Sequence, residues 1–169
     1  MNKNIPIIIL CGGIGTRMKE ETEFKPKPMV LIGGKPIHWH IMKIYSHFGY
    51  NEFILALGYK GEMIRDYFLN QRAFLNDFTL DTSTNKIEFH NNNSDNFKIT
   101  FAETGLKSET GERILRVQKY ITEDEFMVTY GDGVADIDIK KLVEFHKRQG
   151  TLGTISGAHP YSKYGLIKI

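Results

Sequence analysis

Short apolar runs rich in β-branched residues alternate along the chain with segments whose apolar residues recur at helical spacing. The runs end at glycine, as at Gly12 and Gly58. Runs of this kind are typical of strands buried on both faces of a parallel sheet. The first part of the chain therefore predicts strands over residues 5–10 and 52–57 and helices over residues 37–48 and 61–69.

The same alternation continues in the second half of the chain. The polar stretch from Asn91 to Asn96 predicts a loop or a hairpin tip. Asp138 is suited to cap a helix that ends before Gly150. Strands are predicted over residues 98–103, 126–130, 153–158 and 165–169, and helices over residues 112–121 and 138–148. This order predicts an α/β fold: a Rossmann-like open, mostly parallel (mixed) sheet with helices on both faces.

The composition is that of one ordinary globular domain of 169 residues. Twenty-two basic and 20 acidic residues leave a net charge of +2, which argues against a nucleic acid or a membrane surface as partner. The single cysteine, Cys11, excludes an intramolecular disulfide and a Cys-cluster zinc site. Because the sequence has neither a membrane-spanning apolar run nor a signal-peptide pattern, we expect a cytoplasmic protein.

A glycine-rich loop from Leu10 to Met18 follows the first predicted strand. Glycines let backbone N–H groups approach a phosphate closely, and ligands of α/β sheets bind at the carboxyl ends of strands. Met18 breaks the G-x-G-x-x-G dinucleotide pattern, and no Gly-Lys-Ser/Thr follows, so Walker A is excluded. Arg17 would add a positive fork for phosphate oxygens. A tight turn with a solvated Arg17 is the structural alternative.

A second candidate is the segment Lys25-Pro26-Lys27-Pro28. Its prolines predict an extended backbone that fixes the direction of each lysine. Rigid lysines after a glycine-rich loop suit a polyphosphate, since less entropy is lost on binding. An exposed basic linker is the alternative.

The third candidate is Asp132, which lies between Gly131 and Gly133 at the end of a predicted strand. Mg²⁺ takes one or two carboxylates together with phosphate oxygens and water, and this position suits such a site. A simple turn aspartate is the alternative.

The remaining chemistry-bearing residues form no catalytic or metal-binding pattern. His38 and His40 are two residues apart, which places them on different faces of a helix. Cys11 has no evident histidine partner and is predicted to be a small packed residue rather than a nucleophile.

Taken together and in this order, these motifs resemble those of the sugar-1-phosphate nucleotidyltransferases. The matching segments are residues 10–18, 25–30, 33–37, 39–43, 58–61 and 129–136. The resemblance covers essentially the whole chain and is strongest to those members that use CTP and glucose 1-phosphate. Cys11 departs from the alanine that is usual in the family.

The resemblance implies a Mg²⁺-dependent enzyme that transfers a cytidylyl group from CTP to glucose 1-phosphate, giving CDP-glucose and pyrophosphate for surface polysaccharide (lipopolysaccharide) biosynthesis. A homo-oligomer is also expected. Two alternatives stay open: a transferase of the same class with another nucleotide or sugar 1-phosphate, and a catalytically incomplete nucleotide-binding subunit. Residues 1–169 would be a nucleotidyltransferase domain that lacks a C-terminal portion, because the chain ends at Ile169 within an apolar strand pattern. A terminal edge strand is the structural alternative.

The resemblance also assigns roles to individual residues. It implies that the nucleotide is bound by Leu10, Cys11, Gly12, Gly13 and Ile14 and the triphosphate by Gly15, Thr16 and Arg17. Ser108 and Arg113 match positions that recognise the cytosine nucleotide, and Gly131 completes the site. Arg17, Lys27 and Asp132 are the implied catalytic residues, with Asp132 on Mg²⁺.

Overall fold

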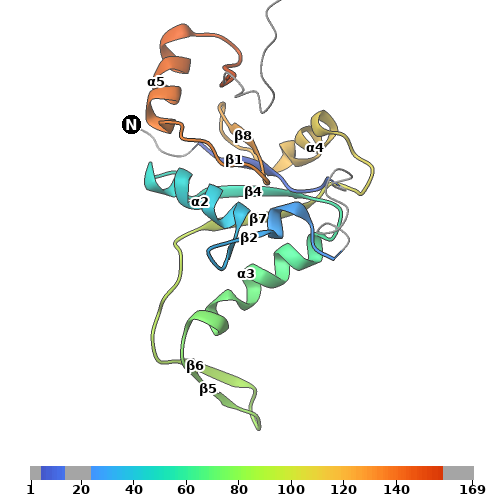
Figure 1. Ribbon diagram of the computed structural model, residues 1–169, viewed down its shortest axis with the longest axis vertical. Coiled ribbons are helices and arrows are strands. Elements are labelled where there is room, and N and C mark those ends of the chain that lie inside the picture. Colours follow the sequence, from blue (N-terminus) through green and yellow to red (C-terminus); the bar gives the residue numbers. More distant parts are fainter. Residues whose placement is uncertain (1–4, 14–23, 158–169) are drawn as a thin grey trace, which may run out of the picture. The chain divides into compact units, whose positions relative to one another are not determined.

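A four-stranded parallel sheet lies at the centre of the first of two compact units, residues 1–135 and 136–169, in a computed structural model that describes residues 5–13 and 24–157 (Figure 1). The strands are β1 (Ile7–Leu10), β4 (Glu52–Leu57), β7 (Lys98–Glu103) and β8 (Met127–Tyr130). Their order in the sheet is β7-β4-β1-β8, and all neighbours are parallel. This arrangement confirms the predicted α/β fold.

Helices cover both faces of this sheet. The long helices α2 (Ile37–His47) and α3 (Gly61–Leu75) lie on one face, where the Tyr45 hydroxyl bonds to Thr129 and the rings of Phe68 and Phe101 are in contact (Figure 1). Helix α4 (Thr110–Val117) lies on the other face. Its Val117 is fully buried in a cluster with Ile8, Ile54, Ala56 and Ala102. Strand β1 is therefore covered on both sides, as its continuous apolar run predicts.

Of the two alternatives predicted for residues 91–96, the loop is confirmed, because that stretch is irregular; the hairpin lies earlier in the chain. Strands β5 (Phe78–Asp81) and β6 (Lys86–Phe89) pair antiparallel and project beyond α3 (Figure 1). The Asp81 carboxylate accepts hydrogen bonds from the Ser83 backbone N–H and from the hydroxyls of Ser83 and Thr84, and Asn85 adopts a left-handed conformation with φ of 55°. Side-chain bonds of this kind stabilise a tight turn.

Shorter elements connect the main ones. A two-stranded pair, β2 (Leu31–Ile32) and β3 (Lys35–Pro36), precedes α2, and two 3₁₀ turns occur at η1 (Lys27–Met29) and η2 (Gln118–Tyr120). The helix predicted over 112–121 is thus the α-helix α4 followed by η2. No helix within residues 5–13 and 24–157 is both long and apolar enough to cross a membrane.

The second unit is described through its helix α5 (Ile139–Gln149). The Asp138 carboxylate accepts a hydrogen bond from the backbone N–H of Lys141 at 3.0 Å, which confirms the predicted cap, and Gly150 ends the helix with φ of 62°. The strand predicted over 153–158 is not formed by residues 153–157. Ile155 is 95% exposed, and no described strand pairs with this segment. The strand predicted over 165–169 lies outside the described residues.

Candidate active site

A pocket of about 230 Å³ opens at the carboxyl edge of the parallel sheet. Loops that follow β1 and β8 form part of it, and the turn η1 and the start of α4 complete it. Ligands of α/β folds bind at this edge, where the loops of neighbouring strands converge. The lining residues are Leu10, Cys11, Gly12, Gly13, Lys27, Pro28, Ser108, Glu109, Thr110, Arg113, Tyr130 and Asp132.

The pocket brings together most of the residues that the sequence singled out. Eight of them line it, from four segments far apart in the chain: Leu10 to Gly13, Lys27, Ser108 with Arg113, and Asp132. Gly131 lies beside the pocket and joins the ends of β8 and β1, since its backbone N–H donates to the Leu10 carbonyl at 3.0 Å. A Cβ atom on Gly131 would lie only 2.8 Å from Cys11 Sγ, so glycine is required at this close approach. Ile14, Gly15, Thr16 and Arg17 lie outside the described residues.

Lys27 and Asp132 both line the pocket and form an ion pair there. Lys27 Nζ lies 3.7 Å from Asp132 Oδ2, and their side chains are 24% and 41% exposed. The backbone at Lys27 differs from the predicted extended form, because Lys27 begins the 3₁₀ turn η1, which the Val30 N–H closes on the Lys27 carbonyl at 3.0 Å. Proline at the second position of the turn favours this conformation. Lys25 is exposed and lies outside the pocket lining.

The donor set at Asp132 fits one Mg²⁺ ligand. Its half-exposed carboxylate supplies the hard oxygen atoms that Mg²⁺ prefers, and the open pocket leaves room for phosphate oxygens and water. Within residues 5–13 and 24–157 there is no group of three or more His, Cys, Asp or Glu side chains able to hold a metal by itself.

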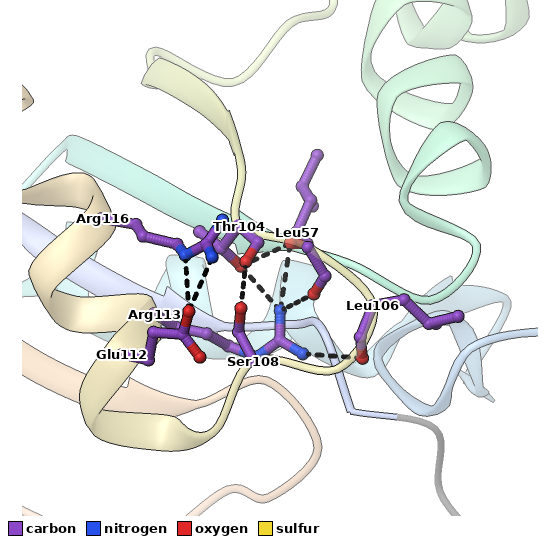
Figure 2. Close-up of polar contacts among 8 residues, drawn as sticks. Leu57, Thr104, Leu106, Ser108, Glu112, Arg113 and Arg116 are labelled. Carbon is purple, nitrogen blue, oxygen red and sulfur yellow. Dashed lines mark hydrogen bonds and ion pairs between the residues drawn. The ribbon is translucent and has the colours of Figure 1, made fainter.

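Arg113 is a buried side chain that connects three loops. Figure 2 shows its contacts with Leu57, Thr104 and Leu106, which belong to two of them. Its Nη1 donates to the Leu57 carbonyl, the Thr104 hydroxyl and the Gly105 carbonyl at 3.2, 2.6 and 2.8 Å. Its Nη2 donates to the Gly12 carbonyl at 2.9 Å and more weakly to the Leu106 carbonyl at 3.4 Å. The guanidinium thus connects the loops after β1, β4 and β7. Burial lowers the pKa of Arg113, and the nearby Glu103 acts in the opposite direction.

Two glycines make room for this guanidinium. A Cβ atom on Gly12 would lie 2.0 Å from Arg113 Nη1, and one on Gly58 would lie 2.6 Å from the same atom. Real Cβ atoms essentially never approach so closely. The glycines after β1 and β4 are therefore needed for the buried arginine and not only for access to a ligand.

Ser108 and Cys11 are held by their surroundings. The Ser108 hydroxyl donates to the Thr104 carbonyl at 2.5 Å, which fixes it beside the Arg113 network (Figure 2).

Cys11 is fully buried, and burial, assisted by the charge of Asp132, raises the pKa of its thiol to about 12. A thiol with that pKa is not a nucleophile at neutral pH, in agreement with its predicted packing role.

Several pocket and supporting residues were not identified from the sequence as members of the site. Pro28, Glu109, Thr110 and Tyr130 line the pocket, and Thr104, Gly58 and His38 support it. Glu109 and Thr110 could have been found from their position beside Ser108 and just before the helix predicted over 112–121. No sequence signal marks the contact of Thr104 with Arg113 or that of His38 with Pro28, because both depend on how the elements pack.

Comparisons with known proteins agree with this geometry. A model of the nucleotidyl transferase family matches residues 6–169. A probable glucose-1-phosphate cytidylyltransferase of Bacillus subtilis is 48% identical over 162 residues, and a glucose-1-phosphate cytidylyltransferase of Salmonella typhimurium is 47% identical over 163. Each match covers 96% of this chain and 63% of the relative, so the chain spans a little under two thirds of their length.

A solved structure extends the comparison to three dimensions. HddC from Yersinia pseudotuberculosis, in complex with GMP-PN, superimposes with a TM-score of 0.64 at 30% sequence identity. The match covers 84% of this chain and 54% of that chain.

Proposed function

Since the chain belongs to the nucleotidyl transferase family, we propose that the protein transfers a cytidylyl group from CTP to glucose 1-phosphate, releasing pyrophosphate. The observation that carries this proposal is the convergence of Gly12, Lys27, Arg113 and Asp132 on one pocket at the sheet edge. Identity of 47–48% to proteins named as glucose-1-phosphate cytidylyltransferases supports the choice of substrates.

The proposed reaction requires alignment and charge neutralisation more than covalent chemistry. A phosphate oxygen of glucose 1-phosphate attacks the α-phosphorus of CTP in line, and pyrophosphate leaves. The nucleophile is already anionic near pH 7, so no general base is needed. Lys27 binds the α-phosphate oxygens and neutralises the charge that develops there. Arg17 is the proposed partner of the departing pyrophosphate.

Asp132 is the proposed ligand of Mg²⁺, which when bound would withdraw charge from the phosphate oxygens and help to orient them. The residue also orients the Lys27 ammonium through the contact at 3.7 Å. A phosphate that enters the pocket would replace this weak ion pair with a direct contact to the Lys27 ammonium, and the Asp132 carboxylate would then be available to hold the cation. The ion pair is thus the arrangement of the nucleotide-free protein, and both of its groups are proposed to act on phosphate.

Recognition of the cytosine nucleotide is the proposed role of Ser108 and Arg113. Arg113 acts chiefly by fixing the loop that carries Ser108 and the Gly12 backbone, because its N–H groups already donate to protein oxygens. A guanosine-nucleotide complex at 30% identity indicates that related chains use other bases. CTP is favoured over GTP here because the more similar relatives carry the cytidylyltransferase name.

The proposal extends to the whole protein. Residues 1–169 would form the nucleotidyltransferase domain of a longer enzyme that acts in surface polysaccharide (lipopolysaccharide) biosynthesis. We also propose a homo-oligomer, and a cytoplasmic location, since CTP and sugar phosphates are held there. The second candidate function is a catalytically incomplete chain that binds nucleotide. This candidate is worth a direct test because the relatives are longer than this chain.

Lys27→Ala should lower kcat/KM of the complete enzyme by about a hundredfold or more, because a preorganised charge at the reacting phosphate is lost. Lys25→Ala is the matched control: its exposed ammonium should matter by no more than about threefold. Steady-state kinetics with CTP and glucose 1-phosphate measure both. Equal losses from the two variants would show that the segment supplies only diffuse positive charge.

The function is tested by a thermal-shift panel of CTP, UTP, dTTP and ATP with Mg²⁺. CTP at about a hundred times its Kd should stabilise the chain by about 2.7 kcal/mol, with smaller effects of the other nucleotides. Equal shifts for all four would refute the cytidylyl assignment, and no shift with any would refute nucleotide binding by this chain.

A further inference from the structure

His38, at the start of α2, is a fully buried histidine that no part of the proposed mechanism uses. Its ring packs edge-on against Tyr67 and Phe68 of α3, with ring centroids 5.7 and 5.2 Å away. Burial lowers the pKa of the ring to about 4, so it is neutral at pH 7. The side chain is a polar group in an apolar setting and requires an explanation.

One hydrogen bond defines the state of this ring. Its Nδ1 lies 2.5 Å from the carbonyl oxygen of Pro28. A carbonyl can only accept, so Nδ1 carries the proton and Nε2 has a bare lone pair. Nε2 has no hydrogen-bond partner among the described residues. A leucine could fill much of this space without leaving a buried nitrogen unpaired, so the bond to Pro28 is what distinguishes histidine here.

Pro28 belongs to the turn that carries Lys27. Within η1, the N–H of Met29 donates to the Pro26 carbonyl at 2.8 Å, and the N–H of Val30 donates to the Lys27 carbonyl at 3.0 Å. The Pro28 ring also lies against the loop of Asp132, since a Cβ atom on Gly131 would be 3.2 Å from Pro28 Cγ. A side chain that holds Pro28 therefore holds the backbone on which Lys27 depends.

We propose that His38 is a positioning residue for Lys27: its Nδ1–H fixes the Pro28 carbonyl, and so sets η1 with the Lys27 ammonium in the pocket beside Asp132. This inference rests on the proposed function, because Lys27 is the group that would meet the phosphates. The structure supports a chain of contacts from α3, through His38 and Pro28, to Lys27. A histidine that merely fills space between α2 and α3 would make no use of Nδ1.

Two substitutions separate these roles. In His38→Asn, the amide nitrogen reaches the position of Nδ1 and keeps a donor, whereas His38→Leu keeps apolar volume without one. We expect His38→Leu to melt only slightly lower than the unchanged chain, because loss of the buried donor to the Pro28 carbonyl is partly offset by removal of the unpaired Nε2. Its Met29 and Val30 amides should nevertheless exchange with solvent at least about tenfold faster, because opening of the turn becomes easier. His38→Asn should retain most of the protection, and the amides of Ile54 and Leu55 serve as references.

The first readout needs no nucleotide. Long-range ¹H–¹⁵N NMR at pH 7 should find the proton of His38 on Nδ1, and amide exchange should distinguish the two variants as stated. The proposal would be overturned by a proton on Nε2 or by equal exchange of the Met29 and Val30 amides in both variants. A much lower melting temperature of His38→Leu with loss of amide protection throughout the chain would overturn it as well.

The second readout is Mg²⁺–CTP affinity in a double-mutant cycle. His38→Leu should weaken binding by about tenfold in the unchanged background and by less than about twofold in the Lys27→Ala background, since coupled residues are not additive. An equal effect in both backgrounds would contradict a role through Lys27. If the unchanged protein binds no CTP, the proposed function fails, and the exchange and tautomer results still decide whether His38 holds the turn.

Discussion

Asp132→Asn is expected to lower turnover of the complete enzyme by about a hundredfold or more, since a neutral amide is a poor ligand for the Mg²⁺ that Asp132 is proposed to hold. Stability should change by no more than about 0.5 kcal/mol, because the carboxylate is 41% exposed and its ion pair with Lys27 is weak. Raised Mg²⁺ should restore part of the activity.

Turnover against Mg²⁺ concentration and the melting temperature, measured on the same preparation, check this expectation. If Asp132 is only a turn residue, the variant should instead lose stability with and without nucleotide. It should then keep near-normal turnover per folded molecule. That outcome would remove Asp132 from the proposed metal site.

Arg113→Lys is expected to destabilise the chain by about 3 kcal/mol, because buried carbonyl groups lose their donors. A single ammonium cannot reach the oxygens of Leu57, Gly12 and Gly105 together, whereas the planar guanidinium does. The loops after β1, β4 and β7 should separate, and the stabilisation by CTP should be lost with them. Chemical denaturation with and without Mg²⁺–CTP measures both effects.

Arg116→Lys is the matched control on the same helix. Arg116 is exposed and pairs with Glu112 one turn away, with Nη2 to Oε1 at 2.6 Å, so its replacement should cost no more than about 0.5 kcal/mol. Equal stability of the two variants, with normal CTP binding by Arg113→Lys, would show that the Arg113 network holds nothing together.

Strands buried on both faces were predicted well from the sequence because their apolar runs are continuous and end at glycine. The bounds of the buried strand β4 agree with the predicted 52–57. The partly exposed edge strand β7 also has its predicted bounds, 98–103. Helix α3 extends to Leu75, beyond the predicted Leu69, because Gln71, Arg72 and Ala73 are good helix formers that carry no apolar periodicity. The hairpin of β5 and β6 was not predicted, because its turn depends on hydrogen bonds that the Asp81 carboxylate accepts, whereas the polar stretch 91–96 was predicted as a loop or a hairpin tip and is a loop.

The site was predicted as a set of segments, and the structure unites those that it describes. Strand-end loops converge in any parallel sheet, so Gly12, Lys27 and Asp132 could be expected at one edge. The burial of the Arg113 side chain could not be predicted, because it depends on a hydrogen bond to the Gly12 carbonyl, 101 residues away in the chain. The tie between His38 and Pro28 likewise becomes visible only once α2 packs beside η1.

The most direct test of the central claim is to identify the product formed by the complete protein with Mg²⁺, glucose 1-phosphate and one nucleotide at a time. We predict CDP-glucose and pyrophosphate in equal amounts from CTP, with UTP, GTP and dTTP giving no more than about a tenth of that rate, as expected when a built site discriminates between bases. Faster formation of a nucleoside diphosphate sugar from any of the other three nucleotides, or pyrophosphate release from CTP without CDP-glucose, would contradict the account.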